Sequence, residues 1–215
     1  RRWMWRSGWV MTALALSAAA LALWGVSRAA SAPHWWNPPR ATSARVIRNA
    51  EEVEGAAMAQ LTLVRESNAP WSVSISQHDA NDWLAARLPL WLESRGQQLP
   101  AQVRTVSAAF TGEGVYLGAK VHPGGRVFWV LAEPRVDDRG LWLTAVRAGM
   151  GDVPVPVDQA LASDLLPPEA RAVLRGEQPA LADVSTTVDG SRRVRLVHLR
   201  PTPGSLEVSA VTEGR

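Results

Sequence analysis

The residues best suited to acid–base or metal chemistry are the histidines and their acidic neighbours. The chain has four histidines, each in a different kind of predicted element: His34, His78, His122 and His198. Only the second has carboxylates close by, in Asp79 and Asp82, and these three side chains could ligate a metal ion. However, Ser76 and Asp79 form a capping box, and acidic residues are expected in the first turn of a helix. We therefore predict that the cluster starts a helix and binds no metal.

The remaining chemical motifs are missing. His34 lies beside two tryptophans and could touch a metal, a porphyrin or the cofactor of a partner, but a lone histidine is more often an interfacial polar residue. The patterns of serine hydrolases, P-loops and zinc hydrolases are absent. Without cysteine there can be no disulfide, no thiolate metal site and no cysteine nucleophile. We predict no catalytic residue, no cofactor and no metal, and a chain that is not an enzyme.

An apolar stretch near the N-terminus differs in composition from the rest of the chain. Residues 7–27 carry no formal charge and lie between Arg6 and Arg28. At about 1.5 Å per residue, a helix of this length crosses a hydrocarbon core of roughly 30 Å. This predicts a basic cytoplasmic tail at residues 1–6 and one transmembrane helix at residues 7–27. The arginines of the tail place the N-terminus in the cytoplasm and the rest of the chain outside the inner membrane.

A cleaved signal peptide is the alternative interpretation of the same stretch. Ala30, Ser31 and Ala32 form a cleavage-like A-x-A site after the apolar run. Pro33 would follow the cut directly, and this position generally rejects proline. An uncleaved anchor is therefore the favoured prediction.

The predicted anchor also offers candidate contact residues. Small side chains four residues apart let helices approach closely in lipid. The span has this spacing in the pair Gly8 and Thr12 and in two alanine pairs, whose members are the candidate contact residues: Ala15, Ala18, Ala19 and Ala22. We predict that this face binds an integral membrane protein. Tryptophans gather at both ends of the span, as expected where indole rings meet the lipid headgroups: Trp3, Trp5, Trp9, Trp24, Trp35 and Trp36.

The rest of the chain predicts one α+β domain. Residues 28–41 form a linker rich in proline and tryptophan, and residues 42–215 form the domain. An apolar stripe of helical period predicts a helix over residues 42–67, a strand over residues 71–77 follows, and a helix interrupted at Pro89 continues to Gly96. Hairpin turns then join four strands at residues 103–110, 115–121, 127–136 and 141–147.

The total is about seven strands in an antiparallel meander sheet and three to four helices. The strand over residues 127–136 is apolar on both faces, which predicts a place in the middle of the sheet. We predict one core, to which the following residues contribute: Trp83, Leu84, Leu88, Val115, Leu117, Phe128, Val130, Leu143, Leu196 and Val208.

Two segments resemble the YpmS-like family of membrane-anchored extracytoplasmic proteins. Residues 74–84, SISQHDANDWL, are similar to its strand-then-helix signature, in which an acidic residue, Asn and Leu follow an Ile/Leu-Ser/Thr pair. Residues 140–144, GLWLT, and 148–156, AGMGDVPVP, resemble its later glycine and proline turn. The resemblance implies no catalytic residues. It implies a curved sheet that wraps a long helix around an apolar groove, as in lipid-binding folds.

These observations lead to three candidate functions. The favoured prediction is a non-catalytic accessory subunit of a larger membrane complex. The alternative is a module outside the cytoplasm that binds a lipid or another apolar ligand, and an envelope enzyme is the least supported. No run of Lys and Arg with interleaved aromatic residues is present, so we predict no nucleic-acid partner and expect membrane protein and lipid bilayer instead.

Overall fold

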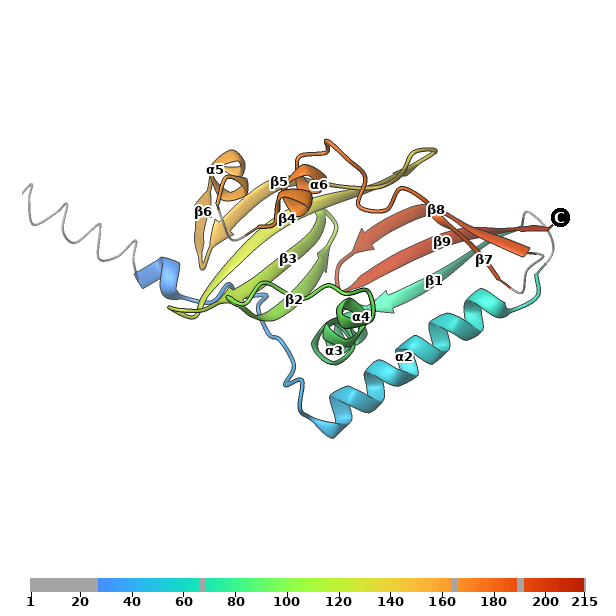
Figure 1. The fold of residues 1–215 in the computed structure, drawn as a ribbon, viewed down its shortest axis with the longest axis horizontal. Coiled ribbons are helices and arrows are strands. Elements are labelled where there is room, and N and C mark those ends of the chain that lie inside the picture. The colour runs from blue at the N-terminus through green and yellow to red at the C-terminus, as the bar shows by residue number, and fades with distance from the viewer. Residues whose placement is uncertain (1–26, 66–68, 164–165, 189–191, 215) are drawn as a thin grey trace, which may run out of the picture.

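A computed structural model of the chain describes residues 27–65, 69–163, 166–188 and 192–214. Its described part is an α+β fold with two antiparallel sheets. Figure 1 shows that the sheets follow one another along the long axis of the molecule, with helices α3 and α4 where they meet. The N-terminal described residues lie at the end of one sheet and the C-terminus lies at the opposite end of the other. The predicted α+β class is confirmed.

The larger sheet is a meander of five strands in sequential order. Its strands are β2 (Val103–Thr111), β3 (Gly114–Val121), β4 (Arg126–Asp137), β5 (Gly140–Met150) and β6 (Val153–Val155). β4 is the central strand, and its residues are buried or half-buried on both faces between Val127 and Ala132. The predicted position of this strand in the middle of the sheet is confirmed.

The smaller sheet combines a strand from the beginning of the domain sequence with three strands from its end. It has four strands in the order β1-β9-β8-β7: β1 (Pro70–Ser76), β7 (Ser185–Thr187), β8 (Arg192–Thr202) and β9 (Ser205–Gly214). β1 pairs with β9 over seven residues, from Pro70 opposite Val211 to Ser76 opposite Ser205. Trp71, Val73 and Ile75 share one face of β1 because side chains alternate along a strand.

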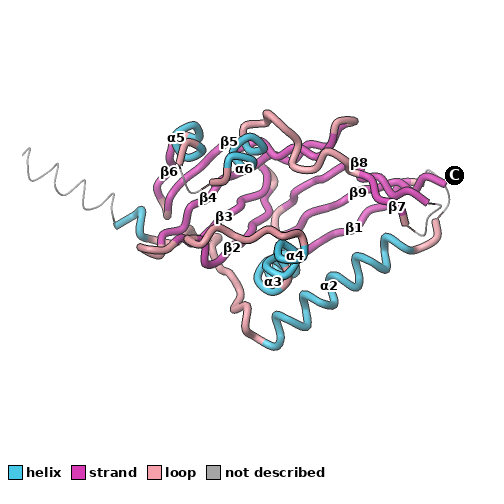
Figure 2. The backbone as a smooth tube through the Cα atoms, viewed as in Figure 1, coloured by secondary structure: helices cyan, strands magenta, loops and turns pink. Residues whose placement is uncertain are grey.

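Five helices surround the sheets in the described residues: α2 (Ala44–Thr62), α3 (Gln77–Ala86), α4 (Leu88–Ser94), α5 (Val157–Leu161) and α6 (Pro168–Leu174). A further helical turn covers residues 27–30. The tube in Figure 2 shows α5 and α6 beside the five-stranded sheet and α2 running away from α3 toward the C-terminal end. Val46 and Ala50 of α2 are buried, whereas most of its second half is exposed.

The predicted fold class is wrong about the sheet. A single meander of about seven strands was expected, but the described residues form nine strands in two sheets. β9 turns back at Gly204 and pairs with β1, so the C-terminal hairpin cannot extend the meander. β6 and β7 have three residues each, which is too short for an alternating pattern to be recognised.

The predicted fold class also includes a membrane-spanning helix, which the described residues do not contain. No helix in the described part of the chain combines the length and the apolar character needed to cross a bilayer. The longest, α2, carries both basic and acidic residues along its length. The predicted span at residues 7–27 lies outside the described residues except for its last position.

The apolar interior is divided into two clusters, not one core. Ala108, Phe110 and Val115 form the first, against which Leu84, Leu117 and Leu206 pack. Ala132, Leu161 and Leu174 form the second, with Val130 and Leu143 packed on it. Of the ten predicted core residues, Val115 is therefore a buried member of the first cluster. Four others pack on the clusters, two on each.

Ser76 caps the start of α3, and the predicted partner Asp79 bonds to its hydroxyl. The Ser76 hydroxyl accepts a hydrogen bond from the Asp79 backbone N–H at 3.1 Å and donates one to the Asp79 carboxylate at 2.7 Å. Asn49 of α2 donates to both Asp79 (3.1 Å) and the buried Asp82 (2.9 Å), which ties the two helices together. Burial raises the pKa of Asp79, but the hydrogen bonds from Ser76 and Asn49 and the charge of His78 outweigh it, and the pKa lies below its ordinary value.

This lowered pKa predicts an acid-sensitive junction. A carboxyl group that is more acidic in the folded chain stabilises it above the unfolded pKa, and the contribution is lost as the pH falls through the folded pKa. We expect the melting temperature of the Asp79→Asn variant to fall less steeply below about pH 4 than that of the wild type. Asp158→Asn is the control, because the Asp158 carboxylate has no partner among the described residues, and its slope should match the wild type. Equal slopes for all three proteins would contradict the assignment.

Candidate functional site

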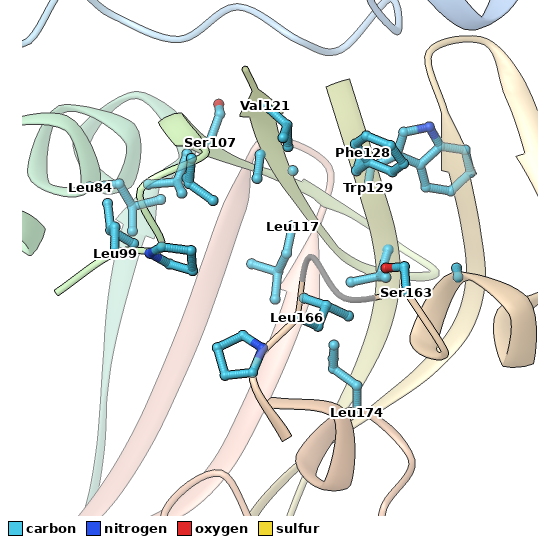
Figure 3. A pocket seen from close by; sticks show the side chains of 18 of the residues that line it. Leu84, Leu99, Ser107, Leu117, Val121, Phe128, Trp129, Ser163, Leu166 and Leu174 are labelled. Carbon is cyan, nitrogen blue, oxygen red and sulfur yellow. The ribbon is translucent and has the colours of Figure 1, made fainter. Parts of the chain in front are cut away.

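A cavity of about 350 Å³ lies against the inner face of the five-stranded sheet and is partly open to solvent. Figure 3 shows its lining side chains converging from the sheet, from the α3–α4 region and from the α5–α6 region. It occupies the space between the two apolar clusters.

The floor of the cavity comes from alternate residues of neighbouring strands. Leu117 of β3 lies opposite Val130 of β4, and Ala119 lies opposite Phe128. All four line the cavity, because residues paired across an antiparallel ladder point to the same face. The small side chain of Ala119 leaves room between its larger neighbours.

One wall is built by α3, α4 and the loop that follows them. Leu84 and Leu88 lie four residues apart and reach the cavity from the same side of the chain. After α4 the backbone turns at Gly96, whose φ of 68° is in the left-handed region that glycine adopts without strain. This turn brings Leu99 and Pro100 back to the rim.

The opposite wall belongs to the segment between β6 and β7. Ala160 and Ser163 line the cavity at α5, and Leu174 lines it from α6. The α5 and α6 helices pack on β5 through the second apolar cluster, so they cover the β5 part of this inner face and leave the space above β3 unfilled.

The chemistry of the lining is almost entirely apolar. No charged residue lines the cavity, and its only hydroxyl groups belong to Ser107 and Ser163. The Ser107 hydroxyl is already engaged, because it donates to Asn81 Oδ1 at 2.8 Å. An ion placed here would lose its hydration without gaining a partner, whereas a hydrocarbon chain would only lose water contacts. The volume lies at the lower end of the range of roughly 300–1,000 Å³ for small-molecule sites.

The outer face of the same sheet is covered by an aromatic cluster. Trp35 contacts Trp36, with ring centroids 5.8 Å apart, and Tyr116 at 5.3 Å, and Tyr116 contacts Trp129 at 5.5 Å. A Cβ atom at Gly118 would lie 2.6 Å from the Trp35 ring and 2.8 Å from the Trp36 ring. We call residues 28–36 the N-terminal strap.

The strap is also fixed at its first residues. The backbone carbonyl of Arg28 accepts a hydrogen bond from Asp152 N–H at 3.1 Å. The carbonyls of Arg28, Ala29 and Ser31 converge on Gly151, where a Cβ atom would meet each within 2.6 Å. The predicted linker therefore packs on the sheet over its first part. Trp35 and Trp36 lie on the protein here, and their place at a membrane interface stays a prediction.

The other predicted site residues divide into two groups. The anchor alanines and the remaining belt tryptophans lie outside the described residues: Ala15, Ala18, Ala19, Ala22, Trp3, Trp5, Trp9 and Trp24. The four histidines are exposed, and His78 lies 2.9 Å from Arg45 Nη1 and 3.5 Å from Asp82 Oδ2. In the described ranges no group of three His, Asp or Glu side chains is arranged to hold a metal ion. The absence of catalytic residues stays a prediction.

The sequence predicted a quarter of the lining residues as core but did not predict a cavity. Leu84, Leu88, Leu117, Phe128 and Val130 were predicted as core, and all five line it. The rim was missed, because its residues lie in loops and short helices without a periodic pattern: Leu99, Pro100, Ala160, Ser163, Leu166 and Pro167. The sequence signal for a cavity was Ala119, a small residue among larger apolar residues of interior strand β3.

No family model and no curated protein matches this chain. The similarity to the YpmS-like family therefore stays a prediction from its two short motifs.

Proposed function

We propose that the domain binds the hydrocarbon chain of a lipid, or an apolar ligand of similar shape, in the cavity above β3 and β4. The supporting observation is a cavity of about 350 Å³ without a charged lining residue. A charged or strongly polar headgroup finds no partner inside, so it stays at the rim while the chain enters.

The energetics of the cavity favour an occupant. Each methylene group moved from water into apolar surroundings contributes about 0.8 kcal/mol. Side chains that line an empty space lack van der Waals partners on one side, which lowers the stability of the unliganded domain. A flexible alkyl chain fills an irregular apolar space and restores these contacts.

The test is binding of fatty acids of increasing length to the full chain, followed by displacement of a polarity-sensitive fluorescent fatty acid. Ala119→Trp places a large ring in the cavity and should weaken binding by at least about tenfold, equivalent to 1.4 kcal/mol. Ala57→Trp makes the same change on the exposed part of α2 and should leave binding unchanged. Equal affinity of both variants for the fluorescent fatty acid would refute a ligand in this cavity.

A role as accessory subunit of a larger complex is the second candidate. The observation that favours it is the end of α2, where Met58, Leu63 and Val64 are 55%, 53% and 79% exposed. Crosslinking from position 58 in the native membrane fraction, compared with position 181 on another face, should yield one partner at stoichiometric amount. The location outside the cytoplasm stays a prediction from the sequence.

A further inference from the structure

Helix α4 exposes the most unusual surface of the described chain. Leu90 and Trp91, adjacent in the sequence, are 54% and 41% exposed. Seven tryptophans lie in the described residues, and Trp91 is the only exposed one among them. Exposed tryptophan is costly in water, because a large apolar ring remains hydrated.

This exposed patch lies directly outside the candidate ligand cavity. Leu88, two residues before Leu90 on the same helix, lines the cavity. The loop after α4 adds Leu99 and Pro100 to the rim. Helix α4 is therefore the wall between the cavity and the exposed patch, and a surface that touches the patch also reaches the rim.

The patch carries a cation of the kind that binds phosphate. The Arg95 guanidinium lies 4.1 Å from the centroid of the Trp91 ring. In the described part of the chain Arg95 forms no ion pair, whereas Arg87 at the other end of α4 is paired with Glu54 at 2.7 Å. A guanidinium group matches a phosphate with two hydrogen bonds, and an indole ring prefers the depth of the lipid headgroups.

We propose that this patch, formed by Leu90, Trp91 and Arg95, docks on the surface of a phospholipid bilayer. Leu90 and Trp91 insert among the headgroups and Arg95 binds a lipid phosphate. The proposal rests on the proposed function, since docking then lets an alkyl chain pass between the bilayer and the cavity at the rim. The alkyl chain would then avoid water, in which its methylene groups are poorly solvated.

The size of the patch argues against a protein as occupant. Stable protein–protein interfaces bury about 800 Å² on each partner. Two exposed apolar side chains and one arginine on a helix of seven residues do not approach this area. They do suffice for shallow insertion at a membrane surface, where each buried side chain adds to the affinity.

The chain has no cysteine, so a reporter can be placed at one position. The full chain with Leu90→Cys, labelled with the fluorophore NBD, is mixed with vesicles of phosphatidylcholine and phosphatidylglycerol. We expect a blue-shifted emission and quenching by nitroxide-labelled lipids. Leu181→Cys is the matched control, because Leu181 is 50% exposed on another face. It should show neither change. No blue shift at position 90, or equal shifts at both positions, would overturn the docking proposal.

A kinetic measurement tests the link to the cavity. Transfer of a fluorescent fatty acid from the full chain to vesicles should slow by about tenfold in Trp91→Ala combined with Arg95→Glu. Affinity for the fatty acid in solution should stay unchanged, because neither side chain lines the cavity. Unchanged transfer would overturn docking while leaving the proposed function intact. Equal fatty-acid binding by Ala119→Trp and Ala57→Trp would instead refute the cavity ligand.

Discussion

Replacing Asn81 with leucine should lower the free energy of unfolding by about 3–5 kcal/mol. The Asn81 side chain is buried and acts as the missing neighbour of edge strand β2. Its Oδ1 accepts from Ala108 N–H at 2.7 Å and from the Ser107 hydroxyl at 2.8 Å, and its Nδ2 donates to Ala108 C=O at 2.8 Å. Leucine would leave all three groups buried without a partner, at about 1–3 kcal/mol each.

The measurement is chemical denaturation of both variants, with Ser107→Ala as the graded comparison. Ser107→Ala removes one hydrogen bond and leaves the two bonds between the Asn81 side chain and the Ala108 backbone intact. It should therefore lower the free energy of unfolding by only about 1 kcal/mol. If the free energy of unfolding fell no more in Asn81→Leu than in Ser107→Ala, the hydrogen bonds from Asn81 of α3 would not stabilise edge strand β2.

The sequence predicted the local elements of this fold better than their assembly. The alternation around Phe128 identified a strand covered on both faces, and β4 is the centre of its sheet. Ser76 and Asp79 identified the start of α3, where the Ser76 hydroxyl accepts a hydrogen bond from the Asp79 backbone N–H. These predictions depend on residues within a few positions of each other, where steric and hydrogen-bonding rules act directly.

The division into two sheets depends on long-range pairing that no local pattern encodes. β1 and β9 are far apart in the sequence, and β1 could have paired with any of several exposed strand edges. The cavity was hidden for the same reason. Leu117 and Val130 have the sequence pattern of core residues. Whether their side chains pack against other side chains or line a cavity depends on the distance between the two apolar clusters.

Replacing Gly118 with valine should release the N-terminal strap from the outer face of the sheet. Gly118 is buried in the middle of β3. Because it has no side chain, the rings of Trp35 and Trp36 occupy the space above it. A Cβ atom would already lie 2.6 Å from Trp35 and 2.8 Å from Trp36. Because the strand backbone is held by β2 and β4, the strap is the part that must move.

The expected cost is about 1–3 kcal/mol in stability, the range for overpacked interiors. The more specific expectation is faster tryptic cleavage after Arg40, because a released strap presents this exposed site in an extended form. Gly112→Ala is the control, since a Cβ atom there meets nothing within 4 Å, and its cleavage rate should match the wild type. Wild-type cleavage in Gly118→Val, together with an unchanged melting temperature, would show that Trp35 and Trp36 rest on the sheet without contributing to its stability.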